Sequence, residues 1–226
     1  ALFAGNAQNA GVVFTANPTA TITGASAAVA DVNSINAATS GLVTVNSATL
    51  TGTETALNTA LTAAAANTPT IAGIGAVNVT VDANDAVALA DLGTLTTRTT
   101  GIVTATVTET NITTLLAASQ VETGHALSFT VSTSTAAANS VDAADLISLN
   151  ALTTAPITVD ISGSLTGTPA NLRTVLAANL ALANGAAPAN AQFSGLEREP
   201  ITITGASHTA DDLLYIDSKT SGVVAY

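Results

Sequence analysis

Carboxylates are the side chains in this sequence whose spacing best suits chemistry. They recur as three close pairs, Asp82 with Asp85, Asp142 with Asp145, and Asp211 with Asp212. Calcium takes several oxygen ligands at once, often from turns, so these pairs are weak candidate calcium ligands. The chain has no EF-hand loop and no glycine-rich calcium nonapeptide. We therefore interpret the aspartates first as helix caps that aid solubility, with calcium ligation as the alternative.

Catalytic motifs are absent from the chain. His125 and His208 are its only histidines, and no partner pattern surrounds either of them. No Gly-x-Ser-x-Gly or Ser-x-x-Lys motif occurs, and no glycine-rich loop leads into a lysine, since Lys219 is the only one. We expect a protein that is not an enzyme and that needs no cofactor beyond a possible calcium ion.

The composition narrows the range of partners. Four basic residues stand against fifteen acidic ones, and a net charge of -11 argues against nucleic acid and anionic membranes. No run of about 20 apolar residues occurs, so we expect no membrane span. The absence of cysteine excludes disulfides and thiolate metal sites. The chain starts at Ala1 without a methionine or a basic leader, and we interpret it as a mature or excised segment.

A twelve-residue phrase occurs four times, and the paired aspartates lie in it or near the helix starts that it and its neighbours predict. Its gapless copies are residues 30–41, 90–101, 144–155 and 211–222. Each has an early aspartate and two apolar residues three positions apart, such as Leu92 and Leu95, which share one face of a helix. Gly41, Gly101 and Gly222 end three copies and suit a left-handed C′ position, whereas Pro156 stops the third helix.

An alternating apolar run follows every copy, as in Val43-Thr44-Val45, and predicts a strand with one buried face. Weaker helix–strand repeats lie between the strong ones, and Pro169 suits the first turn of one of their helices. Residues 20–45 align without gaps on residues 201–226, and both contain Thr-Ile-Thr-Gly-Ala-Ser. We expect this stretch to lead from a strand through a glycine turn into a helix capped by Ser26 or Ser207.

We divide the chain into a lead-in or cap over residues 1–19 and a single repeat array over residues 20–226. The expected repeats are at about 20–45, 46–81, 82–107, 108–131, 132–161, 162–203 and 204–226. The lead-in is irregular apart from a short strand near 11–15, and residues 181–200 form the longest insertion, which we expect to be an exposed loop.

The expected fold is a β-rich repeat solenoid with short helices. A ten-residue helix and a five-residue strand are about 15 and 17 Å long, so each helix can return the chain to a new parallel strand. Repetition gives a parallel sheet of helix–strand units along one side. The alternative is a two-sheet β-solenoid with helical corners. In both forms the threonine face of the strands can form hydroxyl ladders.

The repeated Ala-Asp-Leu-x-x-Leu-x-x-x-Thr-Ser-Gly, followed by Thr-x-Val, resembles the repeat regions of giant extracellular bacterial proteins. These include cyanobacterial surface- and motility-associated proteins and RTX-like proteins exported by type I secretion. The acidic, lysine-poor, cysteine-free composition is similar to theirs, and the likeness covers about residues 20–226. It implies a secreted, extracellular or cell-surface protein with a structural or adhesive role.

We expect a structural protein, a subunit or segment of a bacterial surface layer, fibre or filament. Copies of the chain assemble by stacking repeats and completing strands, as homo-oligomers or filaments. The assembly candidates are Phe3, Val12, Val13, Phe14, Val224 and Tyr226. The alternative is an adhesin that binds surface glycan through the threonine face or residues 181–200. An enzyme such as a polysaccharide lyase ranks last, because the four basic residues are scattered.

Overall fold

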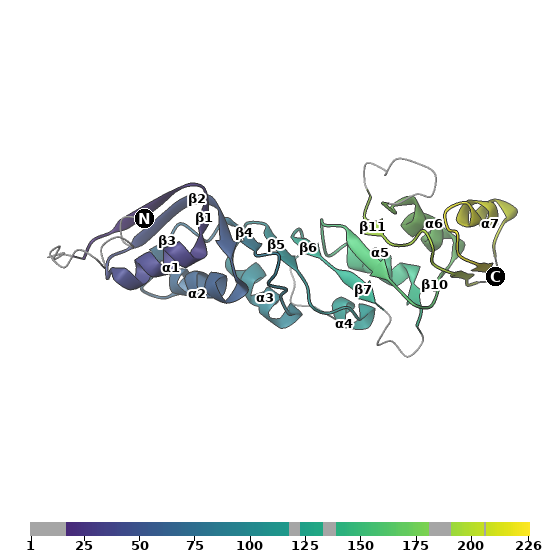
Figure 1. Ribbon diagram of the computed structural model, residues 1–226, viewed down its shortest axis with the longest axis horizontal. Coiled ribbons are helices and arrows are strands. Elements are labelled where there is room, and N and C mark those ends of the chain that lie inside the picture. The colour runs from purple at the N-terminus through teal and green to yellow at the C-terminus, as the bar shows by residue number, and fades with distance from the viewer. Residues whose placement is uncertain (1–16, 118–122, 133–138, 181–190, 206) are drawn as a thin grey trace. The chain divides into compact units, whose positions relative to one another are not determined.

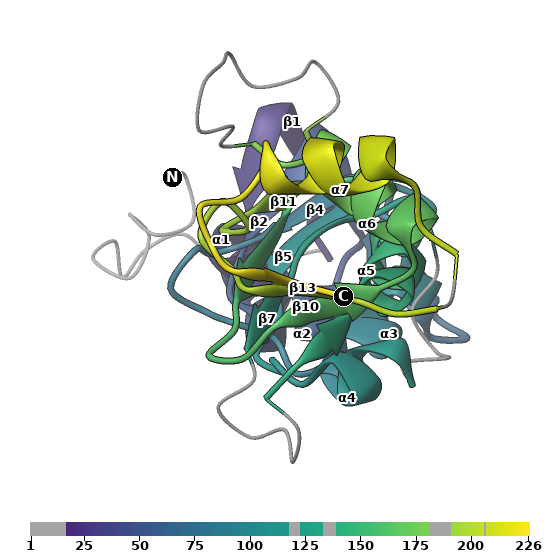
Figure 2. The ribbon, with the colours of Figure 1, turned by 90° about the vertical axis from the view of Figure 1, so that its right-hand side faces the viewer.

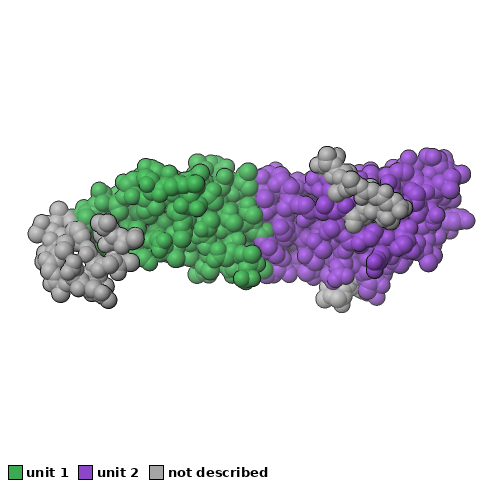
Figure 3. All heavy atoms as spheres, turned by 45° about the horizontal axis from the view of Figure 1, so that its top comes forward, with its two compact units in different colours: residues 1–87, 91–105 green, residues 88–90, 106–226 purple. Residues whose placement is uncertain are grey.

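The computed structural model describes residues 17–117, 123–132, 139–180, 191–205 and 207–226, in which helices and strands alternate along the chain (Figure 1). The chain forms two compact units, which are described separately. Unit 1 comprises Ala1–Val87 and Asp91–Ala105, and unit 2 comprises Ala88–Ala90 and Thr106–Tyr226 (Figure 3).

The core of unit 1 is a parallel sheet covered by helices. Its elements are β1 (Ala20–Ala28), α1 (Val29–Ala38), β2 (Val43–Gly52), α2 (Glu54–Ala65), β3 (Ile71–Ala72), β4 (Asn78–Val81), most of α3 (Leu89–Arg98) and β5 (Val103–Thr106). The strands β1, β2, β4 and β5 pair in that order, and β3 pairs with the start of β2. The side chains of Val43, Leu50 and Val79 are fully buried between this sheet and the helices.

Unit 2 distributes its strands over separate parallel sheets. Its elements are α4 (Ile112–Leu116), β6 (Ala126–Ser128), β7 (Thr130–Ser132), β8 (Val141–Asp142), α5 (Ala143–Asn150), β9 (Ile157–Asp160), β10 (Leu165–Gly167), α6 (Pro169–Ala177), β11 (Phe193–Ser194), β12 (Ile201–Ile203), α7 (Ala210–Asp217) and β13 (Val224–Ala225). One sheet has the order β13-β12-β10-β8 and another the order β11-β9-β7. Helices α5, α6 and α7 pack successively beside them (Figure 2).

The four copies of the phrase form α1, α3, α5 and α7, and a strand follows each helix, as predicted. The predicted serine caps are wrong. Strand β1 continues past Ser26 to Ala28, which has no side chain able to cap α1. The cap of α7 is Thr209, which forms a capping box with Asp212. The predicted Pro169 start of α6 is confirmed, with Thr168 as its cap.

The predicted left-handed glycines at the helix ends are also wrong. Gly41, Gly101 and Gly222 are not among the residues with positive φ. Each lies instead against the backbone of an earlier segment. A Cβ on Gly101 would lie 2.1 Å from the carbonyl oxygen of Val77. These positions therefore need glycine because the chain passes too closely for any side chain, and not because the backbone turns left-handed.

The expected solenoid is wrong in both of its forms, because the structure is an α/β fold with parallel sheets and helices between the strands. The helices are layers of the core and not corners, since Leu57, Leu92 and Leu146 are fully buried. In unit 2, β10 pairs with β8 and β12, whereas β9 pairs with β7 and β11. The strands β7 to β12 therefore alternate between two sheets and do not form one sheet in chain order. The division into seven repeats and a lead-in remains a prediction.

Candidate functional site

Helix α7 and residues 223–226 carry apolar side chains that are exposed or half-buried, and we call them together the terminal face: Leu213, Leu214, Val223, Val224 and Tyr226. Leu214 is 71% exposed, Val223 76% and Tyr226 79%. In Figure 2, α7 and β13 are the elements of unit 2 nearest the viewer. Large apolar side chains that stand together on a surface mark a site of interaction more often than single ones do.

Earlier copies of the same repeat bury the counterparts of Leu213, Val224 and Tyr226, whereas Leu42 and Ile102, the counterparts of Val223, are exposed there too. Tyr226 occupies the position of Val45 and Val159, which are only 1% and 2% exposed. Leu213 is half-buried, whereas its counterparts Val32, Leu92 and Leu146 are fully buried. Leu213, Val224 and Tyr226 are therefore less buried than their counterparts in the earlier repeats.

Strand β13 also differs from β2, the corresponding strand of unit 1, in the number of strands that pair with it. In unit 2, Ile201 pairs with Val224 and Thr202 with Ala225. The aligned residues of unit 1 pair in the same register, Ala20 with Val43 and Thr21 with Thr44. Strand β2 then receives β3 on its other side, where Ile71 pairs with Val43. Strand β13 has no such second neighbour among the described strands.

Arg173 of α6 holds α7 in position. Its Nη1 lies 3.0 Å from both Asp211 Oδ2 and Asp212 Oδ1, and its guanidinium lies 4.4 Å from the centre of the Tyr215 ring. Hydrogen bonds from Thr209, and then from Arg173, lower the pKa of Asp212. The bond to Asp211 is the main cause that raises the pKa of Arg173. This cluster borders a hollow lined by Thr168, Pro169, Ala170, Arg173, Ser207 and Asp212.

The aspartates considered as calcium ligands lie at helix ends and turns. Asp85 Oδ2 accepts the Glu54 N–H at the start of α2 at 2.6 Å, and the N–H of Asp85 donates to the Asp82 carbonyl. Asp142 caps α5 by accepting the Ala144 N–H at 2.8 Å. Asp211 and Asp212 bind Arg173, as described above. Four of the six therefore have a capping or ion-pairing role through their side chains, and Asp82 contributes its backbone carbonyl to a turn.

Asp145, the sixth of these aspartates, lies in the first turn of α5. Its pKa is raised by burial and by the nearby charge of Asp142. In the part of the chain that the structure describes, no three His, Asp or Glu side chains form a group able to hold a metal ion. Calcium binding remains a prediction.

The two histidines lie in different surroundings. His125 is buried, and its backbone carbonyl accepts the Thr154 N–H at 2.9 Å. His208 is exposed beside the terminal face, with its ring centre 5.6 Å from that of Tyr226 in an edge-on arrangement. His208 therefore belongs to the surroundings of the terminal face.

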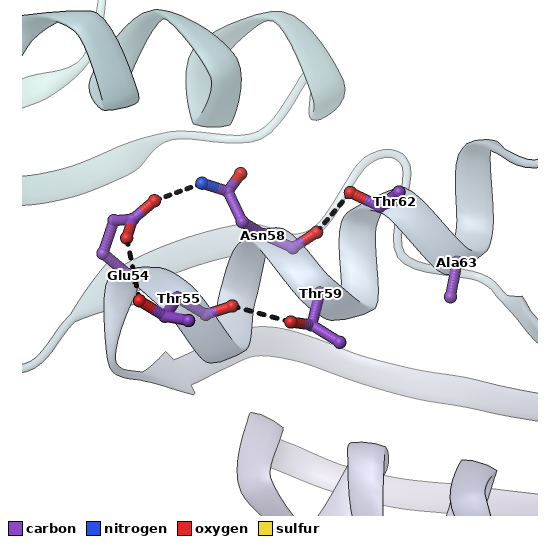
Figure 4. Close-up of a pocket in the computed structure, with 6 residues that line it drawn as sticks. All are labelled: Glu54, Thr55, Asn58, Thr59, Thr62 and Ala63. Carbon is purple, nitrogen blue, oxygen red and sulfur yellow. Dashed lines mark hydrogen bonds between the residues drawn. The ribbon is translucent and has the colours of Figure 1, made fainter.

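A shallow hollow on α2 is lined by polar side chains (Figure 4). The Thr59 hydroxyl donates to the Thr55 carbonyl at 2.9 Å, and the Thr62 hydroxyl donates to the Asn58 carbonyl at 2.6 Å. The Glu54 carboxylate accepts hydrogen bonds from the Asn58 amide and the Thr55 hydroxyl. These groups bond mainly to one another along one helix, so the hollow offers few donors arranged for a ligand.

Among the predicted assembly residues, Val224 and Tyr226 lie in the terminal face, while Phe3, Val12, Val13 and Phe14 lie outside the described residues. Sequence reasoning missed Leu213, Leu214 and Val223 in this role. The equivalent positions in the other copies hold Asn33, Gly93 and Ile147, so an apolar residue at Leu214 is no signal by itself.

In unit 2 two single hydrogen bonds join hydroxyls, from Ser194 Oγ to Thr158 Oγ1 and from Thr202 Oγ1 to Ser164 Oγ, both at 3.4 Å, and the predicted threonine ladders remain a prediction. Of the 181–200 segment, residues 181–190 lie outside the described part of the chain.

No described helix is both long and apolar enough to cross a membrane. No family model, curated protein or solved structure matches this chain.

Proposed function

We propose that this chain is a non-catalytic structural protein of the bacterial cell exterior. It is a subunit or segment of a surface layer, fibre or filament that assembles from copies of itself. The observation that supports the proposal is the terminal face, where Tyr226 is exposed and Leu213 half-buried although their counterparts in earlier repeats are buried. The resemblance to giant extracellular repeat proteins, and the acidic cysteine-free composition, support the extracellular setting.

The apolar driving force of the terminal face is moderate. Full burial of a leucine or valine side chain is worth about 1.5–3 kcal/mol, and association costs about 4–15 kcal/mol in lost freedom. Burial of Leu214, Val223 and Tyr226 is thus comparable with that cost and does not greatly exceed it. Backbone hydrogen bonds along the β13 edge add to the attraction. Assembly should therefore depend strongly on protein concentration.

Charge opposes the association of copies. Each chain carries a net charge of -11, so two chains repel each other at low ionic strength. Salt shortens the Debye length to about 10 Å at 0.1 M and weakens this repulsion. We expect assembly to increase with salt. Calcium, if it binds, should promote assembly beyond magnesium at the same ionic strength.

Negative-stain microscopy with light scattering on the purified chain tests the proposal. The chain is compared over a range of concentrations in sodium chloride, magnesium chloride and calcium chloride at matched ionic strength. Fibres or sheets that grow with concentration support a structural role. An excess in calcium alone assigns the aspartates a ligand role. A single monomeric species under every condition would contradict the proposal.

The alternative, an adhesin that binds surface glycan, draws support from one row of hydroxyls in unit 1. Thr51, Thr80 and Thr104 stand in register on adjacent parallel strands. A glycan array tests this alternative, with Thr80→Val as the variant, because valine keeps the shape of threonine and removes its hydroxyl. Binding that is lost in the variant favours the adhesin, and an array without binding excludes it.

A further inference from the structure

We propose that a small hollow in unit 1 binds a monocarboxylate with a short apolar tail, and that Arg98 binds its carboxylate group. The hollow measures about 220 Å³ and is lined by the end of α2, by residues 69–75 around β3 and by the end of α3. Pockets for drug-sized ligands have volumes of about 300–1,000 Å³, so the ligand of this hollow should be smaller. Such a site is separate from the terminal face and adds a function to the proposed assembly.

The described side chains that line the hollow are apolar, except that of Arg98. Leu61 and two alanines contribute from α2, and Ile71 and Ile74 contribute from the other side. Leu61, Ile71 and Ile74 are also core residues with almost no exposed surface, so their positions are fixed by packing. A short hydrocarbon tail placed against these side chains removes apolar surface from water, which favours binding.

Arg98 supplies a positive charge at the edge of this apolar surface. It is the last residue of α3 and is half-buried, and its Nη1 donates to the Thr62 hydroxyl. No carboxylate among the described residues forms an ion pair with it. The negative end of a helix favours a cation, but a guanidinium has five N–H donors, and Thr62 accepts from only one of its nitrogens. Two parallel hydrogen bonds to a carboxylate are the usual use of such donors.

Gly75 lines the hollow together with Arg98 and leaves it open. A Cβ on Gly75 would meet no atom within 4 Å, and its φ is not positive, so neither close approach nor backbone conformation requires glycine there. Its counterpart in unit 2 is Glu197, because the Gly75 carbonyl accepts the N–H of Thr100 and the Glu197 carbonyl accepts that of Ser221. Glu197 Oε2 is buried. Unit 2 thus has a carboxylate of its own at the position that unit 1 leaves open.

Hydrogen bonds hold the two sides of the hollow together before any ligand binds. The Thr100 N–H donates to the Gly75 carbonyl at 2.9 Å, and the Thr99 hydroxyl donates to the Val77 carbonyl at 2.7 Å. Arg98 directly precedes these two threonines, so its backbone is held beside the segment that carries Gly75. A site formed in advance loses less conformational freedom on binding than one that the ligand must order.

Hexanoate is the probe, because it joins one carboxylate to a short alkyl tail. It is titrated into the labelled chain at constant pH and ionic strength, and the amide signals of Gly73, Gly75 and Arg98 are followed by NMR. Acetate lacks the tail and 1-hexanol lacks the charge. N-acetylleucine presents the carboxylate of a peptide end, so it separates a peptide from a free acid as the source of the ligand.

We expect hexanoate to shift these three amides with saturation, and acetate and 1-hexanol to bind about tenfold more weakly or less. Tighter binding of N-acetylleucine than of hexanoate would support the site and assign it to a peptide end. Equal binding of hexanoate and 1-hexanol would overturn the role of the charge. Shifts that hexanoate does not cause at these amides, or causes equally across the chain, would overturn the site.

Two pairs of variants test the residues. Arg98→Gln should weaken hexanoate binding about tenfold, whereas Arg198→Gln, which removes an exposed arginine, should leave it unchanged. Gly75→Glu gives unit 1 the carboxylate that unit 2 carries and should abolish binding, and Gly75→Gln, of similar size but uncharged, should reduce it less. Circular dichroism checks that each variant is folded. Hexanoate binding that is the same in Arg98→Gln and Gly75→Glu as in the natural chain would overturn the proposal.

Discussion

The Thr99 hydroxyl donates a hydrogen bond to the Val77 carbonyl oxygen at 2.7 Å, which fastens the end of α3 to a segment 22 residues earlier. Thr99 Oγ1 also accepts the N–H of Gly101 at 3.0 Å. The same pair of bonds occurs in the other three copies of the phrase, at Thr39, Thr153 and Thr220. The threonine two residues before the end of each copy is therefore a clasp to an earlier segment, with glycine as the last residue in three copies and Ala155 in the other.

Removal of one clasp hydroxyl should destabilise unit 1. Thr99→Val keeps the size of the side chain but leaves the Val77 carbonyl and the Gly101 N–H without their partner. A buried polar group that loses its hydrogen bond costs about 1–3 kcal/mol. Urea denaturation followed by circular dichroism should show a loss of this size. Thr99→Ser, which keeps the hydroxyl, is the control, and an equal loss in both variants would contradict the clasp.

A methyl group at the clasp glycine should also destabilise the fold. The Cβ of Gly101→Ala would lie 2.1 Å from the Val77 carbonyl oxygen, so the backbone must move. Overpacking of this kind costs about 1–3 kcal/mol or more. Gly75→Ala is the matched control, because a Cβ there meets no atom within 4 Å. Equal thermal unfolding temperatures of the two variants would show that close approach is not the reason for glycine.

Stability should fall in acid partly through Asp212. Its pKa is lowered in the folded chain, so its ionised form stabilises the fold above the ordinary aspartate pKa of about 3.9. This contribution disappears as the pH falls through the lowered pKa. Asp212→Asn should therefore be less stable than the natural chain at pH 7 and equally stable in strong acid. Denaturant titrations at several pH values measure the convergence.

Arg173→Gln tests how the stabilisation of the Asp212 carboxylate divides between its partners. Hydrogen bonds from Thr209 are the largest cause of the lowered pKa, and those bonds remain in this variant. The loss at pH 7 should therefore be smaller than in Asp212→Asn. A larger loss would show that Arg173, and not the capping box, dominates.

Glu199 should have the opposite dependence on pH. Burial, followed by the charges of Asp160 and Glu197, raises its pKa. Its ionised form therefore disfavours the fold once the pH rises above the ordinary glutamate pKa of about 4.3. Glu199→Gln should be more stable than the natural chain at pH 7, and the gain should vanish below about pH 4. A gain that persists in acid would contradict an electrostatic origin.

The sequence was sufficient to place the helices and many of the strands. Aspartates at the first turns and apolar pairs such as Leu92 with Leu95 are local signals, and they located α1, α3, α5 and α7. The alternation of Val43-Thr44-Val45 showed that one strand face is buried. It could not show which strands pair, because alternation is the same in one continuous sheet and in several short ones.

The terminal face could be predicted only in part. Val224 and Tyr226 were identified as assembly residues because they lie in the final alternating run. Leu213 and Leu214 were missed because their apolar pattern reads as an ordinary core face of a helix. Only the structure shows that Val32, Leu92 and Leu146 are fully buried while their counterpart Leu213 is half-buried.

The most direct test of the account is sedimentation velocity over a concentration series of the natural chain and of Leu214→Asp with Tyr226→Asp. The natural chain should form larger species as its concentration and the salt concentration rise, and the double variant should remain monomeric while keeping its circular dichroism spectrum. Thr55→Asp, which adds charge on the exposed surface of α2, should assemble like the natural chain. Equal assembly of all three chains would contradict the role of the terminal face.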